Sequence, residues 1–217
     1  MSSAKLPYFE RVMMFASFFS FGLLFYRCLF SLSLNYTFFL WNLLIAFVPY
    51  VISKQLLKCK TLNARAFSLL ILWLLFFPSC IYLFTDMLQM RKTNFPLVYD
   101  VCMFLSFAVT GILPGLMSLR KVEIFLSNHL PAFLVRLSIL LFIFLSSYNI
   151  VLARFLHFRS WNIAADFRKM FHAAEEDFLA PQSNLHAWLT ILTLVFLIDL
   201  IYAGFKHLNR FERIRLM

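Results

Sequence analysis

The chain has 217 residues, of which 62% are hydrophobic and only 14% are charged, and 29 of them are phenylalanine. So few charged side chains cannot cover the surface of a soluble domain, which excludes the soluble classes of protein. The net charge of +10 would suggest nucleic acid as a partner of a soluble protein. In a membrane protein, basic loops instead set the orientation and meet anionic lipid, so we expect membrane lipids as partners and no nucleic acid.

Six apolar segments are long enough to cross a hydrocarbon core of about 30 Å. They are predicted at residues 12–32, 36–55, 66–84, 97–119, 131–153 and 185–205. The first follows Lys5 and Arg11, but it has full spanning length and no small-x-small cleavage site, so we expect an uncleaved span. The expected fold is all-α: a polytopic transmembrane helical bundle of about six spans that forms a single membrane domain, residues 1–217.

The longest stretch outside the spans joins the fifth span to the sixth. Within it, Phe167, Phe171 and Phe178 recur at helical spacing with charged residues between them. This pattern predicts an amphipathic helix at 161–179 that lies in the membrane interface.

Six spans place both termini on one side of the membrane. Most of the 20 Lys and Arg residues fall in the loops and tails on that same side. The positive-inside rule therefore predicts that the N-terminus and the C-terminus are both cytoplasmic.

Polar residues from separate spans share one depth, close to the outer interface. The set is Arg27, Trp41, Asn42, Tyr82, Thr85, Asp86, Tyr99, Asp100 and Arg154, with Trp161 just beyond the fifth span. Arginines and aspartates in one layer can neutralise one another, which lowers the cost of holding charge near hydrocarbon. The layer forms either an outward-facing polar pocket or an interfacial lock that only anchors the bundle.

In the pocket reading, Asp86 and Asp100 are candidate catalytic acids, because mutual repulsion would leave one of them protonated and able to act as an acid. Arg27 and Arg154 would bind an anion or balance charge. The remaining candidates would bind through hydrogen bonds or ring contacts: Trp41, Asn42, Tyr82, Thr85, Tyr99 and Trp161.

Three further features lie inside the spans. Gly111 and Gly115 have the small-xxx-small spacing of close helix approach, and their face is a candidate contact for a membrane-protein partner. Pro49, Pro78 and Pro114 are expected to interrupt three consecutive spans, as in transporters with broken helices. Asp199, an intramembrane acid, is either functional or neutralised by a neighbouring hydroxyl or by Arg136.

Metal and cofactor signals are weak. The spacing of His172 from Glu175 and Glu176 would let a helix present His and Glu to a metal, but a convincing third ligand is missing. The sequence also has no phosphate-binding glycine loop. The four cysteines form no Cys-x-x-Cys pair. We expect no metal and no cofactor.

Four runs together resemble a known family: LWNLLIAFVP (40–49), FFPSCIYLFTD (76–86), PLVYD (96–100) and SSYNIVLARFLHFRSWN (146–162). The family is the bacterial integral membrane family catalogued as domain of unknown function 1361, and the resemblance covers roughly residues 27–166. The chain departs from the family pattern at Ser79, Ile81, Val98, Asn149, Ala153, Arg159 and Asn162. The resemblance implies a divergent member in a bacterial inner (plasma) membrane, and it brings no activity.

The sequence therefore predicts a multi-pass membrane protein that binds or processes an envelope lipid or a small polar ligand in an outward-facing pocket. A small-solute or ion transporter and a structural subunit of a membrane complex are the alternatives. The pattern does not decide whether the protein is an enzyme.

Overall fold

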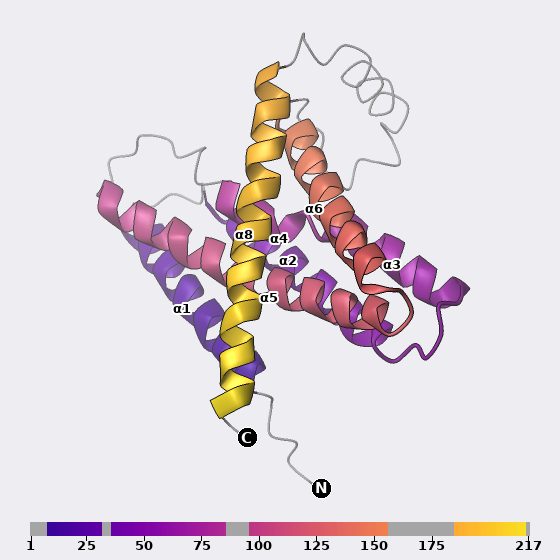
Figure 1. The fold of residues 1–217 in the computed structure, drawn as a ribbon. Coiled ribbons are helices and arrows are strands. Elements are labelled where there is room, and N and C mark those ends of the chain that lie inside the picture. The colour runs from indigo at the N-terminus through magenta and orange to yellow at the C-terminus, as the bar shows by residue number, and fades with distance from the viewer. Residues whose placement is uncertain (1–7, 32–35, 86–95, 156–184, 216–217) are drawn as a thin grey trace, which may run out of the picture.

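The computed structural model describes residues 8–31, 36–85, 96–155 and 185–215. These residues form helices and contain no strand (Figure 1). The helices are α1 (Tyr8–Ser31), α2 (Phe38–Leu56), α3 (Ala64–Phe76), α4 (Ser79–Thr85), α5 (Leu97–Ser127), α6 (Ala132–Phe155) and α8 (Leu185–Arg215). The predicted interfacial helix at 161–179 lies outside the described residues.

Six stretches of these helices are long and apolar enough to cross a membrane. They are Phe9–Phe30, Phe38–Leu56, Ala64–Thr85, Leu97–Ser127, Ala132–Leu152 and Leu185–Leu208. The prediction of an all-α polytopic bundle with six spans is confirmed.

The third of these stretches is divided into α3 and α4. Phe77 and Pro78 form a turn between the two helices, and Ile81 N–H donates to Pro78 O at 3.0 Å. A proline has no N–H to donate and its ring crowds the preceding turn, so the helix restarts after it. The sequence correctly indicated an interruption at Pro78.

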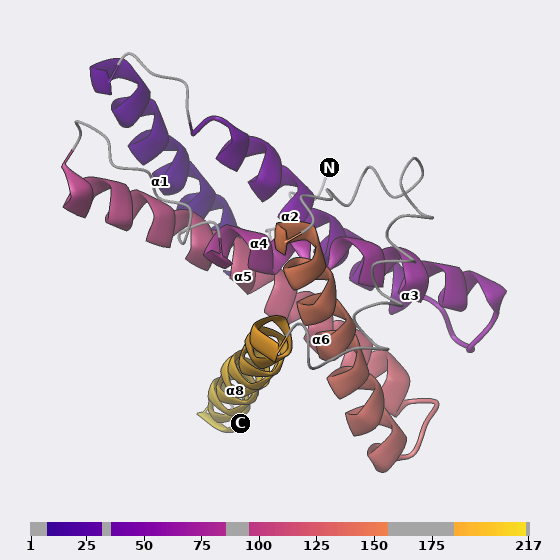
Figure 2. The same cartoon turned by 90° about the horizontal axis from the view of Figure 1, so that it is seen from above.

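The same expectation was wrong for Pro49 and Pro114, which lie inside the continuous helices α2 and α5. Pro49 leaves the carbonyl of Ile45 without its intrahelical donor. The Ser79 hydroxyl lies 3.4 Å from that oxygen, but its single hydrogen has a closer acceptor in Phe76 O at 2.5 Å, so Ile45 O receives only a weak, shared contact from α4. Pro114 lies near the middle of α5, and Figure 2 shows this helix changing direction about half-way along, as expected of a helix that contains a proline.

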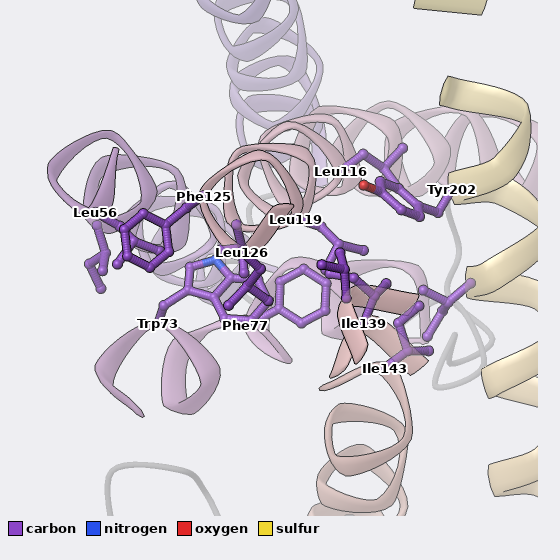
Figure 3. Packing of buried hydrophobic residues seen from close by; sticks show 14 of the residues in the cluster. Leu56, Trp73, Phe77, Leu116, Leu119, Phe125, Leu126, Ile139, Ile143 and Tyr202 are labelled. Carbon is purple, nitrogen blue, oxygen red and sulfur yellow. The ribbon is translucent and has the colours of Figure 1, made fainter. Parts of the chain in front are cut away.

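Helix α5 is the centre of the fold, because it contacts α1, α2, α4, α6 and α8. Figure 3 shows Trp73 and Phe77 packed beneath Leu119 and Leu126 of α5. The two rings are stacked with centroids 4.7 Å apart, and Trp73 Nε1 donates to the Ser118 hydroxyl at 3.1 Å. The buried indole N–H therefore has a partner inside the core.

The close helix approach predicted at Gly111 and Gly115 is present, but its partner belongs to the same chain. A Cβ added at Gly111 would lie 2.4 Å from Leu83 Cδ1, and one at Gly115 would lie 2.7 Å from Cys80 Cβ. Both glycines are buried beneath α4. Helix α4 of the same chain therefore packs against both glycines, and the expectation of a separate membrane-protein partner stays a prediction.

Helix α8 is attached differently from the others. Figures 1 and 2 agree that it runs across α5 instead of alongside it, and its neighbour along the length is α6. Of the six candidate spans, it buries the smallest share of its residues and α5 buries the largest. The start of α1 and the end of α8 both lie at the bottom of Figure 1.

Candidate functional site

Among the ion pairs of the described residues, the most deeply buried joins Arg27 of α1 to Asp100 of α5. Arg27 Nε donates to Asp100 Oδ1 at 2.8 Å, and Nη2 donates to Oδ2 at 3.2 Å. Arg27 is 2% exposed and Asp100 is 3% exposed. Two residues that are 73 positions apart thus form a two-point ion pair inside the protein.

Local sequence explains why both partners reach this point. Helix α5 begins directly after Pro96, and Asp100 lies in its first turn. A carboxylate at this position is favoured by the positive end of the helix dipole. Arg27 lies one turn before the end of α1. Antiparallel packing of α1 on α5 brings these two helix ends together.

Aromatic residues surround the pair. The Tyr36 ring lies beneath the guanidinium, with Arg27 Cζ 4.4 Å from the ring centroid. The Tyr99 hydroxyl donates to Leu23 O of α1 at 2.6 Å. These contacts hold α1 against the start of α5 and shield the charged groups, which strengthens their mutual attraction.

Two other predicted residues belong to a separate contact. The Tyr82 hydroxyl lies 3.4 Å from Asn149 O, which joins α4 to α6. The Thr85 hydroxyl donates to Tyr82 O at 3.0 Å and is buried. Among the described residues, the polar layer therefore includes two groups of polar contacts, one on α1 and α5 and one on α4 and α6.

The remaining candidates are spread more widely. Trp41 is 59% exposed on the surface of the bundle, the position expected of an interfacial aromatic residue. Asn42, its neighbour on α2, is half-buried. Asp86, Trp161 and the side chain of Arg154 lie outside the described residues, so the proximity of Asp86 to Asp100 stays a prediction.

Asp199 of α8 makes the second two-point ion pair. Arg136 of α6 donates from Nη1 to Oδ1 at 2.9 Å and from Nη2 to Oδ2 at 2.7 Å. Pairing with Arg136 is one of the two interpretations of Asp199 that the sequence suggested. Unlike Arg27, the Arg136 side chain is half exposed, at 52%.

The sequence alone did not single out Tyr36 or Glu123. Glu123 of α5 is an ion-pair partner of both Arg120 and Lys206, and it accepts a hydrogen bond from the Tyr202 hydroxyl. One signal was available: Glu123 is an acid among basic residues at the same membrane depth as the tail of the last span.

Neither the small cavity nor the possible metal ligands among the described residues indicate a binding site apart from the polar contacts described above. One small cavity is lined almost entirely by apolar groups where Phe77, Cys80 and Gly115 meet Ile198 of α8, away from Arg27. No group of three or more His, Cys, Asp or Glu side chains in these residues could hold a metal ion.

A comparison with models of known protein families identifies the family of this chain. A family model described as protein of unknown function (DUF1361) matches residues 41–201, well over half of the chain. The chain belongs to the DUF1361 family. The comparisons with curated proteins and with solved structures gave no match.

The matched range clarifies which parts of the site belong to the DUF1361 region. It includes Asp100, Tyr82, Asn149 and Asp199. Arg27 precedes it, so the partner of Asp100 comes from the segment ahead of the matched range. In this DUF1361 protein the central ion pair joins the matched region to α1.

Proposed function

We propose that this DUF1361 protein binds the polar headgroup of an envelope lipid, or a small polar ligand of similar chemistry, at the end of the bundle that holds Arg27 and Asp100. The observation that supports this proposal most directly is the buried ion pair, with two hydrogen bonds, between these side chains. The proposal places the protein in a bacterial inner membrane with both termini cytoplasmic and this end facing outward.

The energetics of buried ions support a role beyond packing. Removing two charged groups from water costs several kcal/mol per ion, and well-packed apolar residues of similar volume are often equally or more stabilising. Ionisable side chains inside membrane spans therefore mark functional sites by default. Arg27 and Asp100 fit this description, because both are almost completely buried.

The chemistry of the pair favours one class of ligand. A guanidinium matches a phosphate or carboxylate through two parallel hydrogen bonds, and a carboxylate accepts from hydroxyl or ammonium groups. A headgroup that carries both a phosphate and an ammonium group can offer the phosphate to Arg27 and the ammonium to Asp100, so the net charge of the site stays the same. Asp86 and Arg154 would extend the same site and, in the enzyme reading, supply the second acid.

Two other functions remain candidates for different reasons. A structural role is favoured by the mutual neutralisation of Arg27 and Asp100, which would also suit a lock between α1 and α5. Transport is favoured only by the interruption at Pro78, because Pro49 and Pro114 lie in continuous helices.

A lipid-dependent stability measurement tests the proposal. Purified protein in detergent is heated with and without added phosphatidylethanolamine, because a ligand that binds the folded state raises its melting temperature. We expect the lipid to raise the Tm of the wild type and to have little effect on Asp100→Asn. Comparing each variant with itself removes the intrinsic loss of stability from the result.

Asp199→Asn is the matched control, since it removes an intramembrane carboxylate from the other two-point ion pair. It should keep the full lipid response. An equal response of the wild type and Asp100→Asn would refute the binding proposal and leave the structural role.

A further inference from the structure

A second polar cluster lies at the opposite end of the bundle and is built on Tyr50 of α2. The Tyr50 ring is buried, with 7% of the residue exposed. Lys121 Nζ of α5 lies 4.6 Å from the ring centroid, and Lys54 Nζ lies 5.2 Å from it. Two ammonium groups from two different helices therefore converge on one aromatic ring.

The charges in this cluster are not balanced. Glu10 of α1 forms an ion pair with Lys54 and accepts a hydrogen bond from the Tyr50 hydroxyl at 3.3 Å. Lys121 is partly buried, and in the described part of the chain no carboxylate lies within ion-pair distance of its Nζ. Three ionised side chains thus leave one excess positive charge, at Lys121.

The helices place this cluster at the depth of lipid headgroups. Helix α5 has 31 residues, about 46 Å at 1.5 Å per residue, so it is longer than a hydrocarbon core of about 30 Å. Lys121 lies in the last third of that length, and Lys54 lies in the last turn of α2. Exposed basic residues follow α2 in sequence: Lys58, Lys60 and Arg65.

We propose that Lys121 and Lys54, which both contact the Tyr50 ring, form a binding site for a phosphate group. An ammonium that is partly withdrawn from water and has no carboxylate partner gains most from an incoming anion. Lysine binds phosphate as a point charge, so two converging lysines need no planar geometry. The phosphate belongs either to an anionic lipid or to a free anion, and this site is independent of the one proposed at Arg27.

The test is native mass spectrometry of the full chain in detergent, titrated separately with phosphatidylglycerol and with inorganic phosphate. A basic residue near a membrane surface contributes about 1 kcal/mol to anionic-lipid binding, so we expect Lys121→Gln to weaken binding of the probe about fivefold. Lys121→Arg, which keeps the charge, should restore most of it.

Lys60→Gln is the matched control, because it removes the same charge from an exposed position close in sequence to Lys54. It should change binding by less than half as much as Lys121→Gln. Size-exclusion profiles of all three variants show whether each one is folded.

The two probes distinguish the sources of the phosphate. Retention of phosphatidylglycerol that inorganic phosphate cannot displace supports a lipid site, and saturable binding of inorganic phosphate supports a free anion. The proposal is overturned if neither probe binds, or if Lys60→Gln and Lys121→Gln weaken binding equally, since that result would describe a diffuse surface charge.

Discussion

Helices α5 and α8 are both 31 residues long, and each contains an apolar span with an acidic residue. Their packing is opposite. α5 lies at the centre and contacts every other described helix, whereas α8 crosses it and packs mainly on α6. Equal length and similar composition therefore do not determine how deeply a span is buried.

The acidic residues of the two helices differ in burial in the same way. Asp100 of α5 and Asp199 of α8 each accept two hydrogen bonds from an arginine. Asp100 and Arg27 are fully enclosed, but Arg136 can extend its guanidinium from the bundle surface toward polar headgroups. The same pair of residue types thus gives a buried ion pair in one place and an adaptable surface pair in the other.

The largest effect is expected from breaking the pair on α5. Arg27→Met leaves the Asp100 carboxylate buried without its cation, and we expect this change to lower the free energy of unfolding by about 3–5 kcal/mol. The measurement is reversible denaturant unfolding of the purified protein in mixed micelles.

A double variant sharpens this result. Arg27→Met combined with Asp100→Leu removes both charges, so it should regain most of the lost stability. A double variant as unstable as Arg27→Met alone would show that shape, and not charge, makes this contact sensitive.

An intermediate effect is expected where α5 packs on α4. In Gly115→Ala the new methyl group meets Cys80 Cβ, which cannot move away without its backbone, so we expect a loss of about 1–3 kcal/mol in the same unfolding assay. Gly111→Ala should cost less, because Leu83 Cδ1 is the end of a flexible side chain.

Gly22→Ala serves as the control for this series. No atom beyond the neighbouring helix backbone lies within 4 Å of a Cβ added at Gly22 on α1, so no loss of stability is expected, and the higher helix propensity of Ala can add up to about 1 kcal/mol. A cost at Gly22 equal to that at Gly115 would contradict the tight packing assigned to α5.

The smallest effect is expected on α8. Asp199→Asn removes the carboxylate from Arg136, but the half-exposed guanidinium can turn to headgroups, so we expect a loss of about 0–1 kcal/mol. The ratio of the Arg27→Met and Asp199→Asn effects measures the contrast between the two helices. A loss at Asp199 as large as that at Arg27 would mean that α8 is as firmly packed as α5.

The spans and the interruption at Pro78 could be predicted because they depend on local chemistry. About 20 consecutive apolar residues satisfy the hydrocarbon core wherever the helix later packs, and a proline lacks its N–H in every context. The effect of Pro49 was not local. The carbonyl that it leaves unpaired at Ile45 lies 3.4 Å from the Ser79 hydroxyl, 34 residues away, and α2 remains continuous.

The candidate site divides in the same way. Membrane depth is expected to follow from position along a span, and on that basis the sequence predicts one layer for Arg27, Asp100, Tyr82 and Thr85. The direction in which a side chain points around the bundle axis cannot be predicted from its position along the span, because each apolar span has several faces of similar hydrophobicity. Only packing paired Arg27 with Asp100 and directed Tyr82 to Asn149.

By itself, the sequence determined an all-helical membrane protein with six spans, since segment length and hydrophobicity suffice for that conclusion. The tertiary structure decided which helix is central, which face Gly111 and Gly115 present to α4, and which charges meet. The physical reason is that hydrophobicity drives a span into the membrane, whereas van der Waals fit and polar pairing select its neighbours there.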